Sequence, residues 1–306
     1  MKHPLVRLLV VVPLAGLLLT ATLTVAWLGL GAPQPARAAT WFTVHRVGTT
    51  ASYTEAPAAP FYVLVLGNDS NPGDPNRPEP GLGDAIHVIG VNPATGDASI
   101  IDVPRDTEAP SGGKINAANA TGGLPSMVAQ LERMMGIDIS YAITTGFSGF
   151  TSMVDEIGGV DITVTEPMVD RDSGTDFQPG NYKMSGDSLL AYSRNRKSYP
   201  AAGDRQRTVN QGKAIIAALT TLRAQNPGAA GTAKLVAILA RHVKTDGMDL
   251  AELYGLGRLA LSLDPARVRN ILLPTGSSGN GTNLAVAAEA QGLFDDFRDD
   301  AILQSH

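Results

Sequence analysis

The fold class is decided by one apolar stretch, Phe61-Tyr-Val-Leu-Val-Leu-Gly67, which is followed at once by Asn68-Asp69-Ser70. The stretch carries no charged residue, and a glycine ends it. A continuous apolar run of this length is typical of a strand that is buried on both faces of a sheet. Helices cover strands of that kind on both sides, so the stretch predicts the centre of an α/β domain that begins at Phe61.

Further strands and helices are predicted on the C-terminal side of this stretch. Two segments, 85–91 and 98–103, are joined by Asn92-Pro-Ala-Thr-Gly-Asp97, a turn-rich sequence typical of a hairpin connection. Apolar residues at helical spacing predict helices that alternate with the later strands. We therefore expect an α/β fold over residues 61–300, in which a central mixed β-sheet is flanked by helices as an α/β/α sandwich. Strands are also expected over 141–146 and 160–164, an apolar segment lies at 268–273, and helices are expected over 124–135, 147–157, 185–195, 204–224, 232–243, 250–263 and 284–297.

The N-terminal part of the chain predicts a membrane anchor. Lys2 and Arg7 precede a run of 24 residues, 8–31, without a charged side chain. About 20 apolar residues span a bilayer core, and basic residues before the run keep the N-terminus in the cytoplasm. We expect a cytoplasmic N-terminus (1–7), one transmembrane helix (8–31), a linker (32–60) and an extracytoplasmic domain. The alternative is a cleaved signal peptide, because Ala36-Arg37-Ala38 resembles a cleavage site.

The composition of the 306 residues excludes several classes of protein. No cysteine is present, which excludes a disulfide scaffold, a thiol nucleophile and a cysteine-ligated metal. The formal net charge is −5, and residues 1–40 contain basic residues but no acid, so the exported part is more acidic than the whole. An acidic domain argues against nucleic acid as a partner.

Polar side chains stand at the ends of three predicted strands. Asp69 follows the first strand, Asp84 precedes the second, and Arg105 follows the third. Ligands of open α/β sheets bind beyond the strand ends, where loops gather side chains without breaking the core. Ordinary turn chemistry is the competing interpretation for the two aspartates. It explains Arg105 less well, because a desolvated guanidinium needs anionic partners.

A denser group of charges lies between positions 194 and 207, where Asp204 alone opposes five cations. Arginine forks bind phosphate oxygens in a bidentate way. A solvated helix end is the competing interpretation, and it suffices for Lys197 and Arg205. Arg207 and Gln211 are one helical turn apart and share a face. With the aspartates, the arginines indicate a metal-assisted phosphoryl or pyrophosphate site. The five cations are Arg194, Arg196, Lys197, Arg205 and Arg207.

Seven short motifs, taken in order, resemble those of the LytR-CpsA-Psr family. The resemblance covers about residues 61–222, and the tail to about residue 298 is compatible with it. Single motifs of this kind are common in proteins, whereas seven in sequence are specific. The motifs are Val-Leu-Val-Leu-Gly-Asn-Asp-Ser (63–70), Gly-Asp-Ala-Ile (83–86), Val-Pro-Arg-Asp-Thr (103–107), Lys-Ile-Asn-Ala-Ala (114–118), Gly-Gly-Val-Asp (158–161), Ala-Tyr-Ser-Arg-Asn-Arg (191–196) and the spaced motif 203–211, from Gly-Asp through Arg207 to Gln211.

The resemblance implies a membrane-anchored enzyme that moves a glycopolymer from a polyprenyl pyrophosphate carrier onto peptidoglycan with the help of Mg²⁺ or Mn²⁺. A sugar hydroxyl of peptidoglycan would attack phosphorus. Asp69 and Asp84 match the family's acidic pair near the metal, and with Arg105 they are the expected catalytic residues. The expected pyrophosphate ligands are Arg105, Arg194, Arg196, Arg207 and Gln211, with Asp204, Lys114 and Asn116 in support.

The chain departs from the family's usual pattern at three places. Leu82-Gly83-Asp84-Ala85 stands where the family usually has Arg-Ser-Asp-Thr, so one phosphate-binding arginine is missing, and Arg77 is a candidate substitute. Asn71 stands where arginine is common, and Gln211-Gly212 stands where two glutamines are common. Two alternatives therefore stay open. One is a pyrophosphatase that acts on the same lipid, and the other is a catalytically impaired protein that binds lipid or serves as a wall scaffold.

Overall fold

The computed structural model describes residues 40, 42–48, 53, 59–70, 79–199, 203–225, 228–279 and 282–304. A seven-stranded mixed sheet runs in the order β10-β1-β5-β2-β3-β4-β11. Strands β2, β4, β5 and β11 point one way, and β1, β3 and β10 point the other. The strands are β1 (Phe42–Arg46), β2 (Phe61–Asn68), β3 (Gly83–Asn92), β4 (Asp97–Val103), β5 (Ile139–Thr145), β10 (Val243–Asp246) and β11 (Arg269–Leu272).

The apolar stretch that predicts the fold forms the middle of this sheet. Strand β2 pairs with β5 in parallel and with β3 in an antiparallel arrangement. Leu64 and Leu66 are both 0% exposed. The predicted hairpin is also confirmed, because β3 and β4 are antiparallel and their ladder ends at the pair Asn92–Asp97.

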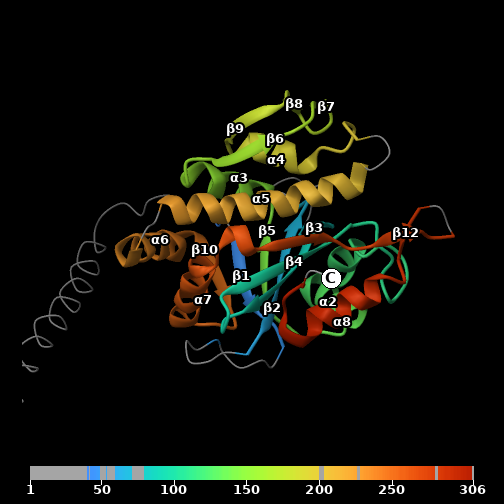
Figure 1. Cartoon of the computed structure of the whole chain (residues 1–306), viewed down its shortest axis with the longest axis horizontal. Coiled ribbons are helices and arrows are strands. Elements are labelled where there is room, and N and C mark those ends of the chain that lie inside the picture. The colour runs from blue at the N-terminus through green and yellow to red at the C-terminus, as the bar shows by residue number, and fades with distance from the viewer. Residues whose placement is uncertain are drawn as a thin grey trace, which may run out of the picture. The chain divides into compact units, whose positions relative to one another are not determined.

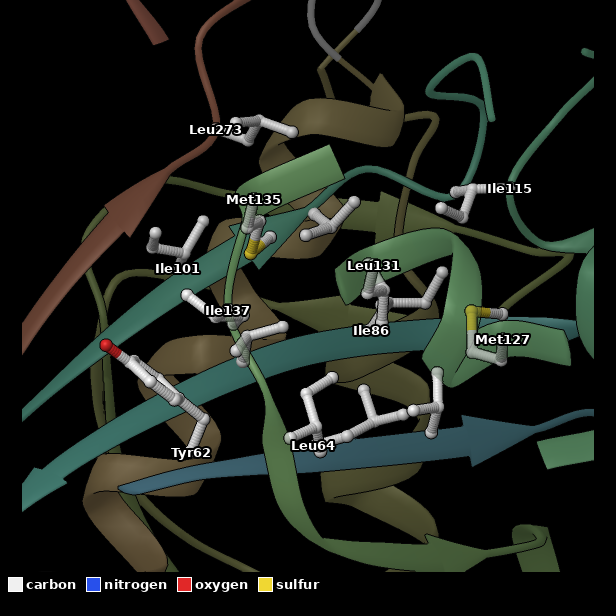
Figure 2. Packing of buried hydrophobic residues seen from close by; sticks show 14 of the residues in the cluster. Tyr62, Leu64, Ile86, Ile101, Ile115, Met127, Leu131, Met135, Ile137 and Leu273 are labelled. Atoms are coloured by element: carbon white, nitrogen blue, oxygen red, sulfur yellow. The ribbon is translucent and has the colours of Figure 1, made fainter. Parts of the chain in front are cut away.

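Two helices cover one face of the sheet. The helices are α2 (Ala117–Met135) and α8 (Ala290–Asp300). Met127 and Leu131 of α2 pack with Leu64 and Ile86 of the sheet in one buried cluster (Figure 2). Burial of one such side chain contributes about 1.5–3 kcal/mol, so this cluster is a main source of the stability of the fold.

Helix α5 (Gly203–Gln225) lies on the other face of the sheet, together with α6 (Gly228–His242) and α7 (Leu250–Ser262) (Figure 1). The predicted fold class, a mixed sheet with helices on both faces, is confirmed. A further layer packs on the far side of α5, where Ala214 of α5 joins the buried cluster of Val154 and Leu189. That layer contains α3 (Phe147–Glu156), α4 (Gly186–Arg194) and the hairpins β6 (Val160–Val164) with β9 (Gly180–Met184) and β7 (Met168–Asp170) with β8 (Thr175–Phe177).

The structure corrects two predicted boundaries. Phe42–Arg46, inside the predicted linker 32–60, forms strand β1 of the central sheet, so the domain begins before Phe61. The strand is short and of mixed polarity, and its two partners lie far away in the sequence, which is why composition alone assigned it to a linker. The expected helix 284–297 begins only at Ala290, because Leu284–Val286 forms strand β13 and pairs with β12 (Thr275–Ser277).

The predicted cytoplasmic N-terminus and transmembrane helix, residues 1–31, lie outside the described residues, as does most of the predicted linker. Among the residues that the structure does describe, no helix is long and apolar enough to cross a membrane.

Candidate active site

The carboxyl ends of β2, β4, β5 and β11 meet at one edge of the sheet, because these four strands are parallel. The first residues of β3 lie at the same edge, since β3 is antiparallel to β2. The N-terminal half of α5 also reaches this edge, where Arg205 donates to the carbonyl of Thr275 at 3.0 Å. Binding sites of α/β sheets form at such an edge, and the candidate residues gather here.

A β-bulge presents Asp84 at this edge. Gly67 is paired with Ala85 and Asn68 with Gly83, so Asp84 is an extra residue in β3. Bulges redirect a side chain in this way, often beside an active site. The Asp84 Oδ1 atom accepts a hydrogen bond from Arg105 Nη1 at 2.8 Å. Burial alone would lower the pKa of Arg105, but the neighbouring Asp84 carboxylate raises that pKa above its usual value.

Arg207 is the most deeply buried arginine of the group. Its side chain lies on α5, the residue is 5% exposed, and its Nη2 is 3.0 Å from Asp204 Oδ1. Arg196 Nη1 lies 3.6 Å from the same oxygen. Burial lowers the pKa of Arg207 below its usual value against the effect of Asp204, and the charge of Arg105 acts in the same direction as burial. Four charged groups therefore share this small region.

The guanidinium of Arg207 has nitrogen atoms without a hydrogen bond to any described residue, although Asp204 Oδ1 lies 3.0 Å from its Nη2. Within the described part of the chain, neither its Nε nor its Nη2 makes a hydrogen bond. The Nε of Arg105 is in the same situation, although Asp106 lies 3.8 Å away. Buried polar atoms of folded proteins are nearly always paired, and exceptions need an explanation. An anion held between Arg105 and Arg207 would supply the acceptors.

Gln211 ties three elements together beside Arg207. Its Nε2 donates to the carbonyl of Ser193 in α4 at 3.1 Å and to the carbonyl of Asp84 at 3.4 Å. Since Arg207 and Gln211 are one turn apart, α5 presents both to the same edge of the sheet, as their spacing predicts.

The hairpin β7–β8 fixes the loop that carries Arg196. Asp170 accepts hydrogen bonds from the backbone N–H groups of Arg196 and Lys197, each at 3.2 Å. Burial acts to raise the pKa of Asp170, but these and two further backbone hydrogen bonds leave it below its usual value. Asn195, 0% exposed, also donates to Thr175 Oγ1. The sequence analysis missed Asp170, although Asp-Arg-Asp-Ser-Gly over 170–174 is a typical Asx-turn sequence.

Arg194 lies at the end of α4, and its guanidinium stacks on an aromatic ring. Its Cζ is 5.1 Å from the ring centroid of Phe147, the first residue of α3. A cation over a ring at this distance is attracted to the π-electrons. Phe147 was not predicted as a site residue, and its place two residues after the end of β5 is a signal that could have indicated it.

The other predicted residues lie at the border of the group. The Asp69 Oδ1 atom accepts from the backbone N–H of Leu82 at 2.7 Å, and no described contact joins Asp69 to the arginines. Lys114 Nζ donates to Asp106 Oδ1 at 2.8 Å. Asn116 acts through its backbone, which bonds to Gly83 and to Arg105. Arg77, the candidate substitute for a missing arginine, lies outside the described residues.

Asp84 and Asp69 are the candidate ligands of a divalent metal. No group of three or more His, Cys, Asp or Glu side chains gathers anywhere in the described ranges, so these residues do not form a complete protein cage. In both aspartates the described hydrogen bonds use Oδ1. Mg²⁺ is often bound through one or two carboxylates, with substrate phosphates and water as the other ligands. The two aspartates fit a site of that open kind.

Comparison with known proteins points to a single family. A family model described as the LytR_cpsA_psr family matches residues 43–294. A polyisoprenyl-teichoic acid–peptidoglycan teichoic acid transferase, TagU of Bacillus cereus (strain AH820), is 32% identical over 192 residues, which are 61% of this chain and 60% of TagU. The chain thus spans less than two thirds of the length of this curated relative.

Solved structures share the fold. B. subtilis TagV superposes with a TM-score of 0.65 at 22% identity, over 81% of this chain and 99% of TagV. YwtF (TagT) with bound octaprenyl pyrophosphate lipid has a TM-score of 0.61 at 20% identity, over 85% of this chain and 95% of the other. At these identities the structures establish a common fold, and the family model covers most of the sequence. The chain belongs to the LytR-CpsA-Psr family.

Proposed function

We propose that this protein is a membrane-anchored extracytoplasmic phosphotransferase that moves a glycopolymer from a polyprenyl pyrophosphate carrier onto peptidoglycan in cell wall assembly. Two relatives support the substrates: TagU is named for transfer of teichoic acid to peptidoglycan, and a solved structure of TagT has bound octaprenyl pyrophosphate lipid. The charge-free run 8–31 supports a single-pass anchor in the cell membrane, with the domain outside.

One observation carries this proposal. Arg207 is 5% exposed and its Nη2 lies 3.0 Å from Asp204 Oδ1, yet among the described residues neither its Nε nor its Nη2 makes a hydrogen bond, and neither does the Nε of Arg105 beside it. Buried guanidinium groups in this state fit an anion with several oxygens, because each fork can bind two of them. A pyrophosphate is such an anion, whereas a neutral glycan would offer these nitrogen atoms no charged acceptor.

The contacts of the candidate site suggest a separate role for each side chain. Arg105, Arg207 and Arg196 would bind the pyrophosphate oxygens and stabilise the charge that develops on the leaving phosphate. Asp84, held by Arg105 at 2.8 Å, would accept a proton from the attacking sugar hydroxyl. Gln211 would fix the position of α5, and so of Arg207, relative to the backbone of Asp84. Arg194, next to Phe147, would add a further positive charge at the edge of the site.

A divalent ion would be held by Asp84 and Asp69. Bound there, Mg²⁺ or Mn²⁺ would supply further positive charge to phosphate oxygens as a Lewis acid. The backbone N–H of Leu82 orients the Asp69 carboxylate at 2.7 Å, which limits the rotamers that this side chain can adopt.

The test uses the full chain in detergent, a lipid-linked glycan, Mg²⁺ and peptidoglycan fragments. We expect a glycan–peptidoglycan conjugate to form, with release of polyprenyl phosphate that depends on the acceptor. Release that is independent of the acceptor, without a conjugate, would identify a pyrophosphatase. If lipid binds but neither product forms, the impaired lipid-binding alternative is correct. Omitting the divalent ion in a parallel reaction tests the metal.

A further inference from the structure

A charged side chain lies buried in the sheet beneath α5. Asp102 is in β4 and is 0% exposed. It is paired directly across the sheet with His87 of β3, which is 1% exposed. Asn270 of β11 lies diagonally from Asp102, because Asp102 is in register with Leu272. We call His87, Asp102 and Asn270 the buried polar network.

The network satisfies the carboxylate of Asp102 on both oxygens. His87 Nδ1 lies 2.5 Å from Asp102 Oδ1, and Asn270 Nδ2 donates to Asp102 Oδ2. A buried carboxylate is very costly unless it is paired and hydrogen-bonded. The three side chains therefore hold each other in one arrangement, and the network is a fixed surface rather than a mobile one.

Gly212 of α5 rests directly on this surface. A Cβ atom at position 212 would lie 2.5 and 2.7 Å from the two carboxylate oxygens of Asp102 and closer still to Asn270 Nδ2. Ordinary contacts of a Cβ atom begin at about 3.4 Å, so with any residue larger than glycine either α5 or the side chains of Asp102 and Asn270 must shift. Because the two side chains are hydrogen-bonded to each other, we expect α5 to take up much of the shift. The network therefore requires the glycine that stands where the family commonly has a second glutamine.

Gly212 lies beside the residues that reach the anion site. Gln211 directly precedes it and bonds to Asp84 and Ser193. Arg207 lies a little more than one turn earlier in the same helix, 3.0 Å from Asp204. The height of Gly212 above the sheet therefore sets how far Arg207 and Gln211 extend toward Asp84 and Arg105.

We propose that the buried polar network and Gly212 are positioning residues, which set the distance of α5 from the sheet and so place Arg207 and Gln211 for pyrophosphate binding. The inference deepens the proposed function and rests on it. None of the four residues touches the substrate. They act by packing, and a displacement of about 1 Å at a reacting site lowers a rate by up to about 100-fold.

The experiment compares Gly212→Ala with Gly292→Ala in the full chain. Gly292 also lies within a helix, α8, and a Cβ atom there would meet nothing within 4 Å. We expect Gly212→Ala to lower kcat/KM for the lipid-linked donor by about 10- to 100-fold and to weaken binding of inorganic pyrophosphate, with the circular dichroism spectrum unchanged. Gly292→Ala should retain wild-type values.

A double substitution separates positioning from loss of folding. Asn270→Ala removes the atom nearest to the added Cβ, so Gly212→Ala should cost less in an Asn270→Ala background than in the wild type. Equal costs in the two backgrounds, or losses that follow the folded fraction alone, would overturn the inference. Arg207→Ala is the reference for the proposed function. If it leaves pyrophosphate binding intact, the proposed site is wrong. If it abolishes binding while Gly212→Ala does not weaken it, only the positioning inference fails.

Discussion

Arg207→Lys tests whether the guanidinium itself binds the anion. The substitution keeps a positive charge near Asp204, whose Oδ1 is 3.0 Å from Arg207 Nη2, but removes the planar fork whose Nε and Nη2 make no hydrogen bond among the described residues. A hydrogen bond to a charged group contributes about 1.5–3 kcal/mol. Since 1.4 kcal/mol is a tenfold change, the loss of one such bond predicts a kcat/KM for the donor that is lower by about 10- to 100-fold.

The matched control for this substitution lies at the other end of α5. Arg223 Nη1 donates to the carbonyl of Leu263 at 2.5 Å, far along the helix from the anion site, so Arg223→Lys measures the general cost of losing an arginine fork in α5. The assays are initial rates of transfer and calorimetric binding of inorganic pyrophosphate, with thermal unfolding in parallel. The reasoning is refuted if Arg207→Lys binds pyrophosphate as tightly as the wild type, or if both variants lose activity to the same extent.

Three further substitutions test separate parts of the structure. Asp84→Asn keeps the shape of the side chain beside Arg105 but removes its charge, so the initial rate of transfer should fall at least tenfold without a change in the circular dichroism spectrum. A variant as fast as the wild type would exclude Asp84 from the reaction. The pKa of Asp170 lies below its ordinary 3.8, so its carboxylate stabilises the fold above pH 3.8, and this contribution is lost as the pH falls below that value. In Asp170→Asn, the free energy of unfolding, measured by urea titration, should therefore decline less toward acid pH than in the wild type. An unchanged decline would contradict the role of Asp170. In Gly90→Ala a Cβ atom would lie 2.5 Å from Phe297 Cε2, so the free energy of unfolding should fall by about 1–3 kcal/mol while the transfer rate per folded molecule stays constant. A variant as stable as the wild type would mean that α8 shifts without cost and that its packing on Gly90 does not stabilise the fold.

The centre of the fold is predictable from the sequence because the residues that determine it are neighbours along the chain. The apolar run 61–67 must be buried on both faces, and the turn at Asn92–Asp97 allows only a hairpin of β3 and β4. Strand β1 is different. Phe42–Arg46 contains both polar and apolar residues, and the strand forms by pairing with β5 and β10, which come from distant parts of the chain. A five-residue segment of that kind carries no local signal that separates it from a linker.

The candidate site shows the same division. The spacing of Arg207 and Gln211 on one helix fixes their common face, which is a local property. The hydrogen bonds that support the arginine loop come from Asp170 and Thr175 of the hairpin β7–β8, which lie 26 and 20 residues before their partners Arg196 and Asn195. The strand-end argument places Asp69 near the site, but it does not give the hydrogen bond from the backbone N–H of Leu82 that orients the Asp69 carboxylate. Strand ends predict which residues lie near a site, whereas the hydrogen bonds of the loops, which orient the side chains, are not readable from the sequence.

The bulge at Asp84 explains why the site depends on register more than on any single motif. Side chains alternate between the two faces of a strand, so a shift of one residue in the pairing of β3 with β2 would exchange the buried and exposed sets. In the observed register, Ile86 and Val88 enter the core with Leu64, and His87 meets Asp102 below α5. The extra residue at position 84 lets the ladder close at Asn68–Gly83 while Asp84 turns to Arg105. The apolar pattern of β3 therefore fixes the geometry of the candidate site indirectly, because the core that holds Ile86 also determines where Asp84 emerges.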